Sequence, residues 1–291
     1  MSDTKKKKDK GGFHWLYARR AVQIVALVLF CIPVLAAGWG LLGAGVDAGD
    51  SQVATPAQGM LSGTFSASNV FGFNLMDPFA FLQVVVASKT FDLSWLVAAL
   101  PLLVAYALIR GRVFCGWICP VNLVLELVDW LRAKLKLKVY ERVMPRRAKV
   151  GVAAAVLVLS AVVSIPVFEV VSPLSVINKG LVLGSTVGLF TLVAIVLVEL
   201  FWGHRVWCRA ICPLGGFYQV VGKVGLVNVR MDHSACIACG KCKGACLCDP
   251  EILDDVIAGE AKAVCAGDCM ACGKCIDTCP TGALSMGVGR R

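Results

Sequence analysis

The sequence predicts an all-α polytopic membrane protein of four transmembrane helices, in two repeated hairpins with interfacial helices, followed by a small C-terminal α+β domain. Three observations carry this prediction: long apolar stretches, clusters of basic residues that alternate between them, and two runs of cysteine near the C-terminus. The composition agrees, since 58% of the 291 residues are hydrophobic and only 16% are charged, well below the usual quarter. The mean hydropathy is +0.76.

Four apolar stretches approach or exceed the roughly 17–25 residues that a helix needs to cross a bilayer. These stretches lie near residues 21–42, 93–109, 150–168 and 181–202. The second contains Pro101, which a transmembrane helix tolerates. A fifth apolar segment, from Pro78 to Ser88, is too short to span and is predicted to be interfacial or re-entrant.

Basic residues alternate between the two sides of these stretches. The basic N-terminal segment, residues 1–20, holds seven Lys and Arg, residues 43–92 hold one, 110–149 ten, 169–180 one, and the C-terminal region ten. Because basic loops stay in the cytoplasm, both termini are expected there, in a multi-pass protein of the bacterial inner membrane. Lys and Arg residues beside membrane spans usually contact anionic lipids of the bilayer. The net charge of +10 is therefore explained by the lipid bilayer, and no nucleic-acid partner is expected.

Two cysteine runs in the last sixth of the chain share the spacing C-x2-C-x2-C-x3-C. In bacterial ferredoxins with this spacing, the fourth cysteine of each run ligates the other [4Fe–4S] cluster. Cluster I is then expected to take Cys236, Cys239, Cys242 and Cys279, and cluster II to take Cys269, Cys272, Cys275 and Cys246. Residues 226–291 are therefore predicted to form a ferredoxin-like α+β domain that holds two [4Fe–4S] clusters and carries electrons.

The sequence leaves two candidates for the fourth ligand of cluster II, because Cys246 is not followed by proline and Cys248 competes with it. The spacing favours Cys246. Cys265 lies outside the runs and has no assigned role. Gly240 and Gly273 follow the second cysteine of each run, where a tight loop can use a positive φ.

A motif occurs twice within residues 21–225, the predicted membrane domain: residues 112–120 read RVFCGWICP and residues 205–213 read RVWCRAICP. Both contain C-x3-C-P, at 115–120 and 208–213. Proline is favourable at the first position of a helix, so each motif is expected to open a surface helix. In the first helix the predicted apolar face consists of Val121, Val124, Leu125, Val128, Leu131 and Leu135.

The paired motifs contribute four cysteines, which converge if the two halves pack with pseudo-twofold symmetry. They are Cys115, Cys119, Cys208 and Cys212. Four thiolates suit a further metal centre or a thiol redox relay, whereas the simpler interpretation is that small apolar side chains pack the helix ends. Their recurrence in one frame favours a metal or redox site, and the kind of centre stays open.

The apolar stretches, the twin C-x3-C-P motifs and the paired ferredoxin runs together resemble the NapH family, the ferredoxin-type membrane subunits of periplasmic nitrate reductase systems. The segment DPFAFLQ at 77–83 is also similar to that family. The resemblance covers nearly the whole chain. It implies a quinol dehydrogenase component that passes electrons from quinol toward a periplasmic reductase, with a periplasmic iron–sulfur subunit of the NapG type as partner.

Two other functions compete with this interpretation. One is an iron–sulfur assembly or maturation factor that supplies electrons to build another metalloenzyme, and the other is a membrane scaffold whose cysteines bind zinc. Haem b is not expected, because the only histidines, His14, His204 and His233, lie outside the apolar stretches. The sequence names no catalytic or quinol-binding residue, so an enzymatic role is expected only as part of a complex.

Overall fold

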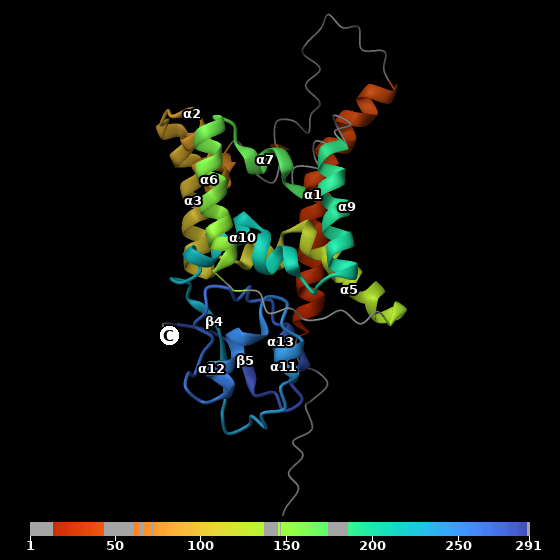
Figure 1. The fold of residues 1–291 in the computed structure, drawn as a ribbon, viewed down its shortest axis with the longest axis vertical. Helices are drawn as coiled ribbons and strands as arrows, with labels where there is room; N and C mark the ends of the chain where they lie inside the picture. The colour runs from red at the N-terminus through yellow and green to blue at the C-terminus, as the bar shows by residue number, and fades with distance from the viewer. Residues whose placement is uncertain are drawn as a thin grey trace, which may run out of the picture.

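The computed structural model describes the backbone of residues 14–43, 61–63, 67–70, 73–136, 145, 147–173 and 186–289. Side chains are described for residues 14–29, 73–136, 145, 147–173 and 190–289. Figure 1 shows two parts, an upper layer of helices and a smaller lower part of short helices and strands. The lower part, residues 226–289, is called the ferredoxin unit below. Residues 1–13 of the predicted basic segment lie outside the described residues.

The upper layer contains two groups of helices joined by shorter ones (Figure 1). One group holds α2 (Pro78–Ser88), α3 (Leu93–Ile109) and α6 (Ala148–Val163), and the other holds α1 (Trp15–Gly43) and α9 (Thr186–Phe201). The shorter elements are α4 (Val113–Trp117), α5 (Pro120–Leu135), α7 (Val167–Val171), the π-helix η2 (Trp207–Ile211) and α10 (Pro213–Val221). Helix α2 packs on α3 and α6, α10 packs on α6, and α5 packs on α1 and α9.

The prediction of four transmembrane helices is wrong for this structure. In the part of the chain that the structure describes, no helix is both long and apolar enough to cross a membrane. Helix α1 has 29 residues, but for the other three predicted spans the physical reason is length: α3 has 17 residues, and α6 and α9 have 16 each within the described chain. At 1.5 Å per residue these helices rise about 24–26 Å, whereas a hydrocarbon core is about 30 Å thick. Side chains of α1 beyond Leu29 are not described, and residues 181–185 of the fourth stretch lie outside the described residues.

The predicted hairpins of consecutive stretches are not the packing units either. Helices α3 and α6 are formed by the second and third apolar stretches. They lie in one group with α2, which packs on both of them. A short antiparallel sheet precedes α2 and was not predicted. Its strands are β1 (Leu61–Gly63), β2 (Ala67–Val70) and β3 (Phe73–Met76), in the order β1-β2-β3.

Local signals at helix starts are confirmed. The short apolar segment forms α2 with the predicted bounds, because Asp77 caps it by accepting the N–H groups of Phe79 and Ala80 at 3.0 and 3.1 Å. Pro120 and Pro213 open α5 and α10 as predicted. On α5, the predicted apolar face is buried at its start and exposed at Leu131 and Leu135, because the last turns extend beyond the helices that cover the first (Figure 1).

The ferredoxin unit is built on an antiparallel pair, β4 (Val227–Met231) and β5 (Leu284–Val288), with Val227 opposite Val288. Between these strands lie α11 (Lys241–Gly244), η3 (Pro250–Leu253), α12 (Asp254–Ile257) and α13 (Lys274–Thr278). Its core holds the buried side chains of Val229, Leu253, Val264, Met270 and Leu284. This mixture of short helices and a strand pair agrees with the α+β domain expected at the C-terminus.

The ferredoxin unit is fastened to the helical layer by buried polar contacts. Arg110, at the end of α3, is fully buried and donates to the carbonyl oxygens of Val264 and Ala266 at 2.9 and 2.5 Å. At the start of α1, the N–H groups of Trp15 and Leu16 donate to the Asp277 carboxylate at 3.2 and 2.9 Å. The two parts therefore meet along a defined interface that brings both paired motifs close to the cysteine runs.

Candidate metal centres

The first cysteine-lined cavity lies within the ferredoxin unit. Its lining includes the four cysteines predicted for cluster I, namely Cys236, Cys239, Cys242 and Cys279. The cavity has about 340 Å³ of empty volume, counting the part open to solvent. The remaining lining is almost wholly apolar, with Met231, Ile257 and Leu284 among it. The chain therefore gathers one complete set of four thiols, with the fourth coming from the second run.

The second cavity gathers the other run. It has about 360 Å³ of empty volume and is lined by Cys269, Cys272 and Cys275 together with both Cys246 and Cys248. Cys246 and Cys248 share a thiol hydrogen bond: burial opposes ionisation of Cys248, yet the Cys246 thiol and the charge of Arg112 lower the pKa of Cys248. Both remain candidates for the fourth ligand. Cys265 is exposed and lines neither of these two cavities.

The loops around these cavities have the same backbone geometry in both runs. Gly240 and Gly273 have φ values of 70° and 71°, which confirms the positive φ expected there. The alanines before the second cysteine of each run, Ala238 and Ala271, also adopt positive φ, at 51° and 48°. An alanine in this region costs on the order of 1 kcal/mol. Two equally strained loops indicate that the loop shape is needed to turn three thiols toward one point.

The third cavity lies between the twin motifs. Its lining includes all four cysteines of those motifs, Cys115, Cys119, Cys208 and Cys212. It has about 410 Å³ of empty volume, and its other lining residues are mostly apolar. The two halves thus place their equivalent thiols around one space, as the repeat suggested. Within the described residues, no group of three or more His, Cys, Asp or Glu side chains is arranged to hold a single metal ion.

Burial governs the electrostatics of the third cavity. Burial raises the pKa values of Cys119 and Cys208, and raises that of Cys212 to about 11. Helix starts oppose this effect. Cys212 caps α10, where Gly215 N–H donates to its Sγ at 3.4 Å, and the first-turn N–H groups of α5 lower the pKa of Cys119 in the same way. The four sulfurs therefore line a mostly apolar site at two helix starts, and the backbone N–H of Gly215 donates to one of them, Cys212 Sγ.

A buried ionic group lies between the second and third cavities. Arg112, which is 1% exposed, donates to Asp268 Oδ1 at 2.9 Å and to the Cys208 carbonyl oxygen at 3.0 Å. Lys149 pairs with the same Asp268 carboxylate and is equally buried. Asp268 directly precedes Cys269 of the second cavity. The Arg112 guanidinium thus connects the backbone of Cys208, in the third cavity, to Asp268, the residue before Cys269 of the second cavity.

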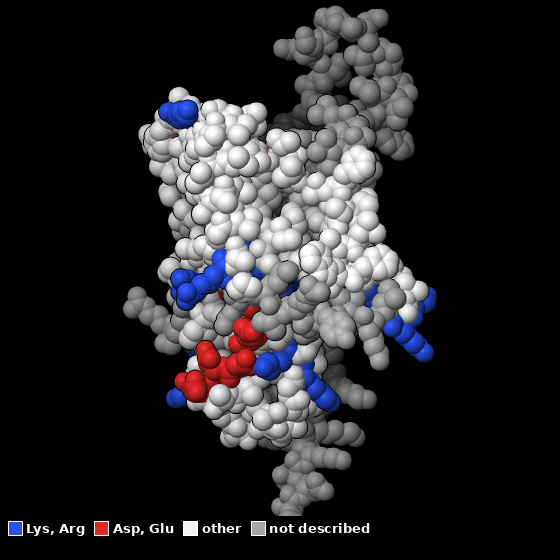
Figure 2. Space-filling model, in the orientation of Figure 1, with Lys and Arg blue, Asp and Glu red and all other residues white. Residues whose placement is uncertain are grey.

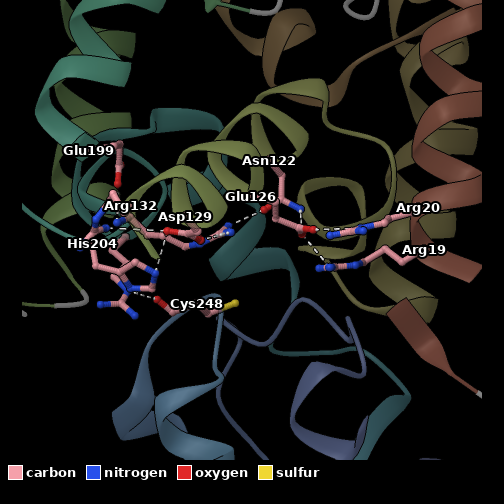
Figure 3. A network of polar contacts seen from close by, with 11 residues as sticks. Arg19, Arg20, Asn122, Glu126, Asp129, Arg132, Glu199, His204 and Cys248 are labelled. Carbon is pink, nitrogen blue, oxygen red and sulfur yellow. Dashed lines mark hydrogen bonds and ion pairs between the residues drawn. The ribbon is translucent and has the colours of Figure 1, made fainter. Parts of the chain in front are cut away.

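Arg205 occupies the position in the second motif that Arg112 occupies in the first, and it anchors a second network. It donates to Asn122 Oδ1 at 2.6 Å and to Asp129 Oδ2 at 2.8 Å. Figure 3 shows this network running from Glu199 and His204 through Asp129 to Glu126, which pairs with Arg19 of α1. The network thereby joins α1, α5 and α9 to the start of the second motif.

A buried acid lies on the other side of the third cavity. Asp77 accepts a hydrogen bond from Tyr218 Oη at 2.5 Å, and burial raises the pKa of Asp77 to about 6. Tyr218 is fully buried, and its ring packs on that of Phe114, which lines the third cavity, at a centroid distance of 6.0 Å. Asp77 and Tyr218 therefore form a protonatable pair, and the ring of Phe114 lies between Tyr218 and the third cavity.

Sequence reasoning missed most of these charged residues. Arg112 and Arg205 were visible as the first residue of each repeated motif, and an arginine at the same place in both copies was an available signal. Asp77 was quoted only as part of a similar segment. Lys149 and Asp268 gave no signal, because neither belongs to a motif and they meet only in the folded chain.

Comparison with known proteins agrees with this geometry. A family profile described as a 4Fe-4S binding domain matches residues 91–138 and again 185–231, and a second profile with the same description matches 266–285. No solved structure matches the chain.

Curated relatives match over most of the chain. The methylamine utilization ferredoxin-type protein MauN of Methylorubrum extorquens is 34% identical over 94% of this chain and 88% of its own length. MauN of Paracoccus denitrificans is 33% identical over 87% of this chain and 83% of its own. The ferredoxin-type protein NapH of Escherichia coli is 30% identical over 76% of this chain and 77% of its own. The chain therefore belongs to the NapH and MauN family of ferredoxin-type proteins, and it is an iron–sulfur protein of electron transfer.

Proposed function

We propose that the protein oxidises quinol at the bacterial inner membrane and passes the electrons, one at a time, through its iron–sulfur sites toward a periplasmic reductase. In this proposal the two ferredoxin runs together hold two [4Fe–4S] clusters, and each cluster takes its fourth ligand from the other run, as their spacing predicts. Such clusters exchange single electrons over a wide range of potentials. The chain acts as one subunit of a complex.

The observation that carries the proposal is the direct packing of the first twin motif on the second cavity. Trp117 Nε1 donates to the carbonyl oxygen of Ala271 at 3.1 Å, between the cysteines Cys269 and Cys272. A Cβ at Gly116 would lie 3.1 Å from the Cβ of Met270, so the backbones are in close contact there. Electrons that enter beside the twin motifs therefore have a short, protein-filled path to the ferredoxin unit.

Quinol oxidation also needs a place for protons. Each quinol that becomes quinone releases two electrons and two protons, so a one-electron carrier alone does not complete the step. Asp77, with a pKa of about 6, can take up one of these protons near the twin motifs and release it again near neutral pH. Tyr218, hydrogen-bonded to Asp77, orients that carboxylate.

The membrane location in the proposal is supported by apolar side chains on the outer surface of the helical layer. On α3 the exposed residues Leu93, Val97, Leu100, Val104 and Leu108 recur at helical spacing on one face. On α9 the exposed residues are Phe190, Val193, Leu197 and Phe201. Figure 2 shows that Lys, Arg, Asp and Glu gather on the lower half of the visible face. Large exposed apolar patches mark contact with lipid or protein, and quinol is dissolved in lipid.

The electron acceptor is the least specific part of the proposal. The similarity to NapH favours a periplasmic nitrate reductase, reached through a periplasmic iron–sulfur subunit of the NapG type. The similarity to MauN is higher and covers more of the chain, which favours an electron-transfer chain of methylamine utilization instead. Both acceptors leave the quinol-oxidising role of this subunit unchanged.

The test is anaerobic EPR spectroscopy of the full chain in detergent, before and after addition of a reduced quinol analogue. Growth of reduced-cluster signals on quinol addition supports the proposal. Clusters that dithionite reduces but quinol leaves oxidised would overturn it and favour the assembly or maturation role. A colourless protein with stoichiometric zinc would favour the scaffold role.

Matched variants sharpen this experiment. Asp77→Asn keeps the cap of α2 but removes the proton acceptor, so quinol should reduce the clusters more slowly while dithionite reduces them as before. Glu260→Gln, at an exposed acid of the ferredoxin unit, serves as the control and should leave both reactions unchanged. Equal rates in Asp77→Asn and the control would remove Asp77 from the proposal.

A further inference from the structure

Each segment matched by the first 4Fe-4S profile contains only two cysteines. Residues 91–138 contain Cys115 and Cys119, and residues 185–231 contain Cys208 and Cys212. A [4Fe–4S] cluster held by cysteine takes four thiolates, so neither segment can complete one alone. The structure resolves this shortfall because it places both pairs around one cavity.

We infer that Cys115, Cys119, Cys208 and Cys212 together hold a third [4Fe–4S] cluster, shared between the two repeats. This inference deepens the proposed function, and it rests on that function only for the role of the cluster as the first acceptor of electrons from quinol.

The third cavity matches the other two in size and lining. Its empty volume of about 410 Å³ compares with about 340 and 360 Å³ for the cavities lined by the ferredoxin runs. Aromatic and aliphatic side chains, among them Phe114, Trp207 and Leu214, close it around the four thiols. All three volumes count space that is open to solvent, so they support a comparison among the cavities. The cavities of the ferredoxin runs are expected to hold cubanes, and the third cavity, similar in volume and in its four thiols, suits the same kind of group.

The two repeats place their second cysteines at the same helix position. Cys119 is the N-cap residue of α5 and Cys212 that of α10, both helices open with proline, and Cys212 Sγ also accepts the Gly215 N–H. The helix N-terminus carries a partial positive charge and free N–H groups. Two helix starts are therefore aimed at the same cavity from opposite repeats, as a group with negative charge requires.

Buried cations supply further compensation. A cluster held by four thiolates carries net negative charge, and burial of such a charge without partners is costly. Arg112 lines the cavity, and Lys149 lies beside it on the shared carboxylate of Asp268. Two cations against one carboxylate leave one positive charge in excess at the edge of the third cavity. Besides Asp268, the Arg112 guanidinium interacts with Cys115 and Cys208 of the third cavity and with Cys248 of the second, so anionic clusters at these cavities would supply the missing negative charge.

The position of the third cavity makes it useful for electron transfer. Arg112 bridges Cys208 of this cavity and the residue before Cys269 of the second. The helix α4, which carries Cys115, packs on the loop that carries Cys272. A third cluster would thus extend the row of redox centres from the ferredoxin unit into the helical layer, toward Asp77 and Tyr218.

The decisive measurement is a count of iron and acid-labile sulfide in the anaerobically purified full chain, with Mössbauer spectroscopy to assign the iron to cubanes. We expect about twelve irons per chain, four for each of three clusters. About eight irons, or stoichiometric zinc in addition to eight irons, would overturn the inference. This count needs no quinol, so its failure is distinguishable from failure of the quinol reaction.

Variants test whether the cluster is shared. Cys119→Ala and Cys212→Ala should each lose the same four irons, and the double variant should lose no more than either single variant. Cys265→Ala, at an exposed cysteine outside the cavities, should retain about twelve. The EPR signals of the ferredoxin clusters report that each variant has folded. Losses that add in the double variant would mean that the two motifs serve separate centres and would refute the sharing.

Discussion

Replacing Arg112 by glutamine tests whether the buried ionic group holds the ferredoxin unit on the helical layer. The substitution removes the charge and two hydrogen bonds to the ferredoxin unit, to Asp268 Oδ1 at 2.9 Å and to the Asp268 carbonyl oxygen at 3.3 Å. It also removes the donor to the Cys208 carbonyl oxygen at 3.0 Å. All of these atoms are buried in the fold, so water does not replace the lost donors.

The expected cost follows from burial. Breaking a buried ion pair by removing one partner destabilises a protein by about 3–5 kcal/mol, because the other charge is left without compensation. Lys149 still pairs with Asp268 in the variant, so the lower end, about 3 kcal/mol, is expected. Arg20→Gln is the matched control, since Arg20 is half exposed and lies 3.8 Å from Glu126. Exposed pairs contribute less than about 1 kcal/mol.

The assay is denaturation of the cluster-loaded protein in guanidinium chloride under anaerobic conditions, followed by tryptophan fluorescence and by visible absorbance of the clusters. Arg112→Gln should lower the midpoint clearly more than Arg20→Gln does. Adding Asp268→Asn to Arg112→Gln should lower the midpoint further, because the buried Lys149 ammonium then loses the carboxylate with which it pairs. If Arg112→Gln were no less stable than Arg20→Gln, the ionic group would not be what joins the two parts.

Three other outcomes are expected. The folded-state pKa of Asp77, about 6, lies above its usual 3.8. Up to about 3 kcal/mol of stability should therefore be present below pH 4 and be lost as the pH rises through 6. Asp77→Asn should remove this pH dependence of the denaturation midpoint. A Cβ at Gly111 would lie 2.2 Å from a backbone oxygen of Tyr218, so Gly111→Ala should lower the denaturation midpoint strongly, whereas Gly151→Ala, with open space around its Cβ, should raise it slightly. Asp277→Ala should cost about 1 kcal/mol and increase hydrogen exchange at the first turn of α1, because two N–H groups lose their acceptor; unchanged exchange there would contradict the docking of α1.

Local structure was predictable because its causes are local. Pro120 and Pro213 mark helix starts by the geometry of a single residue, and the structure has helices that begin at both places. The glycines after the second cysteine of each run adopt the positive φ that the tight loop needs. The family was also predictable, because cysteine spacing and the repeated motif are properties of the chain itself.

Predictions that depended on length and packing did less well. Hydropathy showed that the four stretches are apolar, but it did not show where each helix ends, and no helix of the described chain is both long and apolar enough to span a membrane. The order of the stretches suggested hairpins, whereas α3 and α6 share a group with α2. Apolar residues at the end of α5 are exposed, because no neighbouring helix reaches that far.

The sequence by itself determined the family and that this is an iron–sulfur protein, and its spacing predicts the ligands, because cysteine spacing and turn residues are encoded over a few neighbouring positions. Only the tertiary structure decided that two pairs of cysteines from distant motifs line one cavity, and that Arg112 meets Asp268 and Lys149 beside it. These contacts join residues far apart in the chain, and they depend on which faces of the helices pack together. Periodicity and spacing do not contain that information, because many packings bury the same apolar surface and only the complete set of contacts selects one.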